Sequence, residues 1–246
     1  MKINFDYHMH TIMDHTDHAK NTVEEMVLAA KSRGLEGIAI TNHGLGHKLY
    51  GMQEKDIDEI KSEILSMRKK YPDMKILFGV EANILSLNGD TDITDEMVEK
   101  CDIILCGYHY TVKYKTFKDF WNLLIMNYVA KAIPFIRKIQ IKKNTKAICG
   151  AMKKNNIDIL THPGDKIFVD MDEIAAVAEE TNTVLEINTS HRHLSLDEIK
   201  ICEKYNIKYA ANSDSHIAET VGLVEDSLQR IEEAKLDLEK IINVEI

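Results

Sequence analysis

The chain has 246 residues, of which 44% are hydrophobic and 29% charged, and its formal net charge is −9. This composition is typical of a folded globular protein, and the acidic balance argues against a surface coated by nucleic acid. The longest uncharged apolar-rich run, residues 120–130, is too short for a membrane-spanning helix, which needs about 20 residues. Asp6 and His8 lie where a signal peptide would be apolar, so we expect a cytoplasmic protein with reduced cysteines.

Short apolar runs alternate with amphipathic helical patterns along the chain. Strands are predicted at residues 3–10, 37–42, 76–81, 103–108, 157–161, 184–188 and 209–213. Helices are predicted at residues 22–33, 54–70, 94–100, 145–155, 171–180, 195–205 and 225–235. This alternation favours parallel strands with right-handed crossovers. Seven such units predict an α/β fold in which one domain, residues 1–246, forms a seven-stranded TIM-like (β/α)7 barrel.

One basic segment interrupts the alternation. Residues 112–154 carry ten lysines and Arg137 against the single acid Asp119, whereas the remainder has 20 basic and 39 acidic residues. Apolar residues recur at helical spacing from Phe117 to Ala132, and Pro134 should kink or end this helix. We therefore expect a basic helical insertion at about residues 112–143.

Three interpretations of this insertion are open. Its apolar stripe could pack on the barrel and leave the lysines in solvent. It could instead cap the active site and attract a phosphorylated substrate through basic residues, or bind nucleic acid or a partner protein. The basic residues considered for the cap are Lys113, Lys115, Lys118, Arg137 and Lys138.

Histidine is unusually frequent, with eleven residues, and most of these follow predicted strands. The polar residues at strand ends are His8, His10, His43, Glu81, His109, His162, Asp214 and His216. The C-terminal ends of parallel barrel strands meet at one face, so these side chains should converge. Imidazole and carboxylate ligands suit Zn²⁺, Mn²⁺ or Fe²⁺ better than Ca²⁺. The ligands are too many for one tetrahedral ion, so we expect two or three ions.

The ordered motifs carry a resemblance to a known family. They are Asp6-x-His8-x-His10-Thr11, His18-Ala-Lys-Asn-Thr22, Asn42-His43-Gly44, Gly79-x-Glu81-Ala-Asn83, Gly107-x-His109, His162-Pro-Gly164 and Ser213-Asp214-Ser215-His216. Together they resemble the PHP (polymerase and histidinol phosphatase) family, and within it the small stand-alone phosphatases with a trinuclear metal site. The resemblance implies a distorted barrel with its metal site at the C-terminal ends of the strands.

The resemblance also implies how the ligands are divided among three ions. His8, His10, Glu81 and Asp214 would hold the first ion, and Glu81 would bridge to a second ion held by His109 and His162. His18, His43 and His216 would hold the third. His15 is the alternative to His18, and Asn42 stands where the family usually has an aspartate.

These features predict a phosphatase that hydrolyses a small phosphorylated metabolite, with histidinol phosphate or a nucleotide as plausible substrates. A hydroxide bridging two metal ions, three Zn²⁺ per chain or alternatively Mn²⁺ or Fe²⁺, would attack phosphorus, and Asp214 would orient it. Candidates for binding the substrate phosphate are Arg192, Lys113 and Arg137, with Lys166 a weaker one.

Glu186 and Asn188 should point into the barrel.

The alternatives to a phosphatase are a metal-dependent nuclease or phosphodiesterase that uses the basic segment as its groove, and a metal-stabilised binding domain without activity. No membrane partner is expected, and the oligomeric state is open.

Overall fold

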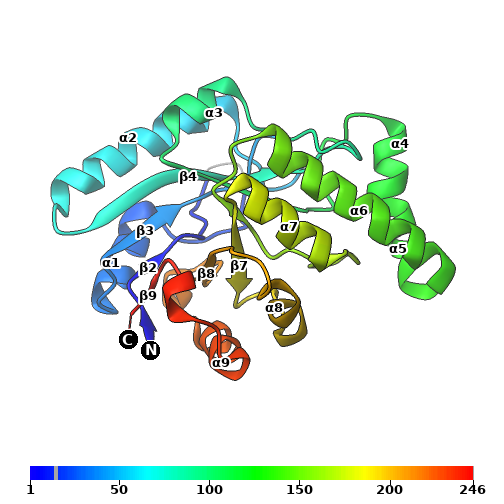
Figure 1. The fold of residues 1–246 in the computed structure, drawn as a ribbon. Helices are drawn as coiled ribbons and strands as arrows, with labels where there is room; N and C mark the ends of the chain where they lie inside the picture. Colours follow the sequence, from blue (N-terminus) through cyan, green and yellow to red (C-terminus); the bar gives the residue numbers. More distant parts are fainter. Residues whose placement is uncertain (14–15, 246) are drawn as a thin grey trace.

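A computed structural model describes residues 1–13 and 16–245. Its centre is a sheet of seven parallel strands in sequential order, β2 to β8, around which the helices are arranged (Figure 1). The strands are β2 (Phe5–Asp6), β3 (Gly37–Ile40), β4 (Lys75–Asn83), β5 (Ile103–Gly107), β6 (Ile159–Leu160), β7 (Val184–Asn188) and β8 (Tyr209–Asn212). The α/β TIM-like fold predicted from the sequence is confirmed.

Helices cover the outside of this sheet. The α-helices are α1 (Val23–Ser32), α2 (Glu54–Lys70), α3 (Asp95–Lys100), α4 (Phe117–Asp119), α5 (Met126–Ala132), α6 (Pro134–Lys154), α7 (Met171–Thr181), α8 (Leu196–Cys202) and α9 (Glu225–Ala234). A π-helix, η1 (Phe120–Ile125), joins α4 to α5, and two 3₁₀ turns are η2 (Ala218–Thr220) and η3 (Leu238–Lys240). Where the sequence shows Ser or Thr before acidic residues, the helices begin as expected: Thr22 and Ser195 each form a capping box with the glutamate three residues later.

Two predicted elements differ in extent. The first predicted strand is divided into β1 (Lys2–Ile3) and β2, because β1 leaves the barrel and pairs antiparallel with β9 (Val244–Glu245). The helix predicted at residues 145–155 begins much earlier, at Pro134. Proline is well suited to the first turn of a helix, where its missing N–H needs no partner. Pro134 therefore ends one helix and starts the next.

Alternate residues of each strand face the barrel interior. Near the N-terminal ends these are apolar or small, as in the buried cluster of Phe5, Ala39, Ile103, Leu105, Ile159 and Ala210. Leu77 on β4 and Val184 on β7 pack against this cluster. Four residues further along β4 and two further along β7, the same rows reach Glu81 and Glu186, which are fully buried. The interior therefore changes from apolar at one end to polar at the C-terminal mouth, where a site can form.

The barrel closes between β8 and β2 without a regular ladder. At the mouth, the His10 N–H donates to the Ser215 carbonyl (2.8 Å) and the Ser215 N–H donates to the His8 carbonyl (3.3 Å). Nearer the base, the buried Asn243 side chain fills the seam. Its amide donates to the carbonyls of Phe5 and Ala211 (both 2.7 Å), and its oxygen accepts from the Ala211 N–H (3.0 Å). The Asn243 side chain thus makes hydrogen bonds that strand pairing would otherwise make at this seam.

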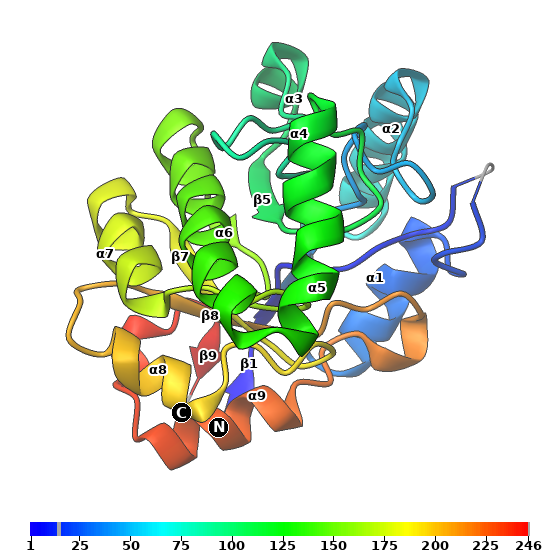
Figure 2. The ribbon, with the colours of Figure 1, turned by 90° about the vertical axis from the view of Figure 1, so that its right-hand side faces the viewer.

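The basic insertion is a helical hairpin in which α4, η1 and α5 form one arm and α6 the other (Figure 2). The interpretation in which the apolar stripe packs on the barrel is wrong. Its residues are exposed or only half-buried: Phe117, Phe120, Trp121, Leu124, Ile125, Tyr128 and Ala132. The arm instead buries Leu123 and Ala130 together with the polar residues Asn122 and Asn127. Helical spacing identifies the apolar face of a helix but not what covers that face.

In the described ranges, no helix is long and apolar enough to span a bilayer.

Replacing the seam side chain should destabilise the fold. Asn243→Ala removes four buried hydrogen bonds, the fourth a long one to Asn212 Oδ1 (3.4 Å), and leaves two backbone carbonyls and one backbone N–H without partners. We therefore expect a loss of about 2–4 kcal/mol in the free energy of unfolding. Urea unfolding followed by circular dichroism measures this. Asn156→Ala, at an exposed position, is the control and should change stability by less than about 0.5 kcal/mol. Equal stability of the two variants would contradict the role given to Asn243.

Candidate metal centre

The mouth of the barrel holds a cavity of about 310 Å³ whose wall is built largely from imidazoles and carboxylates. All nine residues expected to bind metal lie at this mouth, although they come from seven different segments of the chain. The lining residues are His18, His43, His47, Tyr50, Glu81, His109, His162, Lys166, Ser190, His191, Asp214 and His216. His8 and His10 lie directly beneath them.

The first group is formed by the closure of the barrel. The Met9–Ser215 pairing sets His8 and His10 beside Asp214, whose Oδ1 lies 3.5 Å from His8 Nε2 and 3.3 Å from His10 Nε2. Glu81 approaches from β4, with Oε1 3.5 Å from His8 Nε2. These four residues are those expected around the first ion.

The second group surrounds the other side of Glu81. Its Oε1 lies 3.0 Å from His162 Nε2 and 3.4 Å from His109 Nε2. Glu81 therefore stands between two clusters of imidazoles, with ligand atoms of His43, Glu81 and His109 all within 4.8 Å of one another. This is the position that a bridging carboxylate would take.

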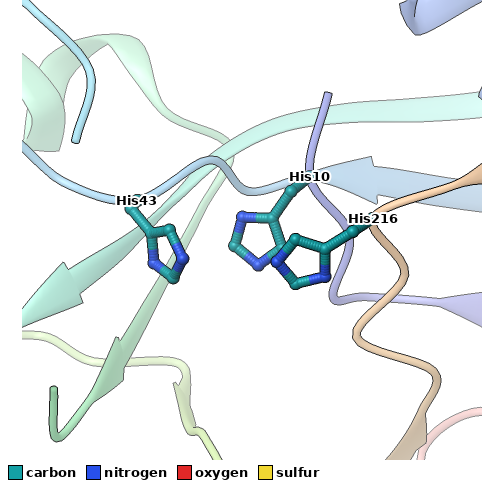
Figure 3. A group of neighbouring side chains, drawn as sticks. All are labelled: His10, His43 and His216. Carbon is teal, nitrogen blue, oxygen red and sulfur yellow. The ribbon is translucent and has the colours of Figure 1, made fainter. Parts of the chain in front are cut away.

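The third group lies nearer the solvent. His18 Nε2 is 2.8 Å from His216 Nε2 and 3.3 Å from His43 Nε2. Figure 3 shows His43 and His216 on either side of His10, and ligand nitrogens of these three lie within 4.8 Å of one another. His15, the alternative to His18, lies outside the described residues.

Outer partners fix the orientation of several rings. Glu186 accepts from His8 Nδ1 (2.8 Å), and Asn83 Oδ1 contacts His109 Nδ1 (2.8 Å), so in both rings Nε2 faces the cluster. Among the described residues, the Asn42 side chain forms no hydrogen bond with an imidazole. Its side chain bonds the Thr11 N–H (2.7 Å) and hydroxyl (2.9 Å), and so anchors the loop that follows His10.

The ionisation of these groups favours cations. Burial and the neighbouring imidazoles lower the pKa of His18 to about 3, and burial lowers that of His109 to about 4 despite Glu81. Both rings are therefore neutral at pH 7, the form that binds metal. His8 is different: against the effect of burial, the charges of Asp214, Glu186 and Glu81 hold its pKa well above the ordinary value. In the described structure, no lysine or arginine forms an ion pair with these three carboxylates.

Several buried polar atoms have no hydrogen-bond partner in the described structure. They include His10 Nδ1, His162 Nδ1, His43 Nδ1 and Glu81 Oε2. The last two lie 2.8 Å apart but are not aligned as donor and acceptor. Unsatisfied buried polar atoms are costly, so the adjacent pair of His43 Nδ1 and Glu81 Oε2 indicates a missing partner. A divalent ion fits this donor set.

His191, Lys166 and Tyr50 also line the cavity, and Asp165 contacts the first two of them. His191 lies between two carboxylates, with Nε2 3.2 Å from Asp214 Oδ2 and Nδ1 3.2 Å from Asp165 Oδ2. Against the effect of burial, these two partners raise its pKa to about 10. Asp165 also pairs with Lys166 (2.9 Å), and Tyr50 stacks on His18 with ring centroids 3.8 Å apart. The position of His191 after the sixth strand was a signal for its role, but no motif marks Tyr50 or Asp165.

The three phosphate candidates from the sequence are not brought into the cavity. The Arg192 side chain is 81% exposed and points toward Asp226. Lys113 Nζ donates to the Leu45 carbonyl (2.8 Å), and Arg137 donates to backbone carbonyls at the end of α5 and stacks on Phe168. Of the basic residues considered, only the weaker candidate, Lys166, lines the cavity.

The chain is similar to proteins named as phosphatases. Two curated relatives are named probable phosphatases: one from Proteus mirabilis is 30% identical, covering 97% of this chain and 89% of its own, and one from Clostridium acetobutylicum is 28% identical, covering 100% and 92%. They bear out the expectation of a hydrolase of the phosphatase class.

A solved structure shares the fold. The histidinol phosphate phosphatase of Lactococcus lactis, complexed with zinc, L-histidinol and phosphate, aligns with a TM-score of 0.67 at 16% identity, covering 95% of this chain and 94% of that one. The chain also matches the PHP domain over residues 6–190. This match covers most of the sequence and contains seven of the nine expected ligands, so the chain belongs to the PHP domain family.

Proposed function

We propose that the protein is a metal-dependent phosphomonoesterase that acts on a small phosphorylated metabolite. The observation that carries the proposal is the convergence of nine imidazole and carboxylate ligands on one open cavity. Zn²⁺ is the proposed ion, at three per chain, with Mn²⁺ or Fe²⁺ as alternatives. Histidinol phosphate, whose parts are bound in the Lactococcus lactis structure, or a nucleotide is a suitable candidate substrate.

The residues present fit such ions. Every ion-pair partner of Glu81 and Asp214 in the described structure is an imidazole. Two buried carboxylates in this position need positive charge, and His10, His109 and His216 do not provide it because burial lowers their pKa values. The two rings whose pKa is raised, His8 and His191, are each shared with a further carboxylate, Glu186 or Asp165. His8, His10, Glu81 and Asp214 would hold one ion, Glu81, His109 and His162 a second, and His18, His43 and His216 a third.

The ions and the residues that line the cavity have distinct roles in the proposed reaction. When bound, the ions supply Lewis acidity, which lowers the pKa of water and neutralises phosphate oxygens. Asp214 orients the nucleophile, and His191 fixes Asp214 by donating to its Oδ2. Lys166 presents positive charge to an entering anion. The Tyr50 ring, held flat on His18, offers an apolar wall for the organic part of the substrate.

A nuclease is less well supported. A cavity of about 310 Å³ suits a small molecule, and a nucleic-acid groove would need cations directed along it. Lys113 and Arg137 instead contact backbone carbonyls of their own chain. A purely structural metal site is also less suitable, because such sites are closed and four-coordinate.

Metal removal should abolish activity reversibly. Elemental analysis of the purified protein should find two to three ions per chain, and chelation should eliminate hydrolysis of an aryl phosphate. Zn²⁺ or Mn²⁺ should restore it, because the ions supply the Lewis acid. Fewer than one ion per chain, with no restoration by any metal, would rule out the proposed centre.

Loss of a ligand should have a similar effect without unfolding the barrel. Glu81→Gln and His10→Ala should each reduce kcat/KM by more than about 100-fold, since even partners outside the ligand shell cost about 10–100-fold. Glu203→Gln, at an exposed position, is the matched control. Circular dichroism tests folding and elemental analysis tests metal content. Normal turnover by either ligand variant would contradict the site.

Replacing Lys166 should weaken substrate binding, whereas replacing Lys113, a phosphate-binding candidate from the sequence, should not. Lys166→Met should reduce kcat/KM for an aryl phosphate by about tenfold, mainly through KM, because a cation facing the cavity is lost. Lys113→Met, which removes a cation outside the cavity, should leave both constants unchanged. The reverse order of effects would place the phosphate site beside the insertion instead.

A further inference from the structure

The loop that follows β6 carries Lys166 to the cavity through an unusual backbone path. His162 and Lys166 line the cavity, and Lys166 pairs with Asp165 (2.9 Å). The backbone is left-handed at three positions within five residues, with φ of 28° at His162, 100° at Gly164 and 66° at Lys166. Glycine adopts this region freely, but a residue with a side chain does so only where the surrounding structure holds it. Lys166 therefore needs support from outside its own loop.

This support comes from the loop that follows β5. The Tyr110 hydroxyl donates a hydrogen bond to the Lys166 carbonyl (2.5 Å). Tyr110 comes directly after the candidate ligand His109, so its backbone begins at the mouth of the barrel. A carbonyl that is held in place restricts rotation of the backbone beside it. The bond therefore restricts the direction in which the Lys166 side chain leaves the chain.

The Tyr110 ring is held in turn by the helical hairpin. It stacks on Tyr128 of α5 with ring centroids 5.0 Å apart, and Lys131 Nζ lies 5.6 Å from the centroid of Tyr110 and 5.2 Å from that of Tyr128. The Tyr114 hydroxyl also donates to the Tyr110 carbonyl (2.7 Å). Stacked rings and a cation over a ring are favourable contacts. Both the ring and the backbone of Tyr110 are thus fixed in position.

The other arm of the hairpin contacts the far end of the same loop. On α6, Asn144 Nδ2 donates to the Phe168 carbonyl (2.9 Å), and the Thr145 hydroxyl accepts from the Asp170 N–H (2.8 Å). The Arg137 guanidinium lies over the Phe168 ring, 4.3 Å from its centroid. The loop is therefore held by the barrel at its start, through Tyr110 at its centre and by α6 at its end.

The hairpin is firm enough to act as a support. Asn127 Nδ2 donates to Asn144 Oδ1 (3.0 Å), Asn144 Nδ2 donates to Asn127 Oδ1 (2.8 Å), and both side chains are buried. The Tyr108 hydroxyl, which follows β5, donates to the Leu123 carbonyl and contacts Asn127 Nδ2 (3.0 Å). Buried amides that satisfy one another rigidify the elements that carry them. The two arms are therefore fixed to each other and to the barrel.

We propose that the helical insertion braces the Lys166 loop, and that Tyr110 is the positioning residue that holds the Lys166 ammonium at the cavity. The proposal rests on the proposed function, in which Lys166 attracts the substrate anion. None of the three interpretations of the sequence gave the insertion this role. It acts through the backbone of a barrel loop rather than through its own lysines, and a site held in this way keeps its charge in the productive place.

Hydrolysis of an aryl phosphate tests the role of Tyr110. Tyr110→Phe keeps the ring stack but removes the hydroxyl, so KM should rise by about fivefold, the effect of one lost hydrogen bond, while kcat and metal content stay unchanged. Tyr128→Phe is the matched control. It removes the hydroxyl from the other ring of the stack, which has no hydrogen-bond partner in the described structure, and KM should not change. Equal KM values for the two variants, or loss of metal from Tyr110→Phe, would contradict the proposal.

A double-mutant cycle shows whether Tyr110 acts through Lys166. In the Lys166→Met background, Tyr110→Phe should cause no further rise in KM, because the side chain that Tyr110 positions is already absent. A further rise of the same size would overturn the proposal, since Tyr110 would then act on the substrate or on the metal centre without Lys166.

Trypsin tests the brace without any substrate. Trypsin cleaves after lysine, and the bond between Lys166 and the buried Ile167 lies within the braced loop. Cleavage requires local opening, so Tyr110→Phe should accelerate it at this bond by about fivefold relative to the wild type and to Tyr128→Phe. An unchanged rate would overturn the brace. A wild type without metal-dependent hydrolysis would instead overturn the proposed function, and the cleavage rates would then decide the brace alone.

Discussion

Burial of negative charge at the mouth of the barrel is the constraint on which the rest of the structure depends. Glu81, Glu186 and Asp214 are removed from solvent, and in the described structure their charged partners are imidazoles. Buried carboxylates without compensating charge are unfavourable by several kcal/mol each. Of the histidines around them, His18 and His109 are held neutral at pH 7, and the Nε2 atoms of both rings face the cluster. The site thus favours bound cations.

The surrounding fold serves to hold these ligands. Asp6, at the end of β2, accepts hydrogen bonds from the Ser213 hydroxyl (2.5 Å) and the Gly222 N–H (2.9 Å), and so ties the first strand to the loop that carries Asp214. Glu186 binds both His8 and the His162 backbone (2.8 Å). Asn243 closes the seam below them. Ligands from opposite ends of the chain are therefore set against one another by buried hydrogen bonds, which makes a preorganised site possible.

The helical insertion makes two separate contributions. Its buried amides support the end of β5, directly before the candidate ligand His109, and its apolar side faces solvent. Six of the fifteen large apolar side chains that are exposed in the described structure lie on this insertion. The same element therefore supports the end of β5 through its buried amides and exposes apolar side chains elsewhere.

The sequence by itself determined the barrel and the candidate ligand set. Alternation in strands and the shared location of parallel strand ends are local rules, so His8, His10, Glu81, His109, His162 and Asp214 could be assigned to one face without coordinates. Tertiary structure alone decided what surrounds them. Arg192 and Lys166 both follow barrel strands, yet the Arg192 side chain points to solvent and Lys166 lines the cavity. The conformation of a loop does not follow from the spacing of apolar residues in the elements beside it. The apolar stripe of the hairpin was recognised, but its environment depended on amide pairs between residues such as Asn127 and Asn144. Contacts across the chain, rather than spacing along it, determined which face was buried.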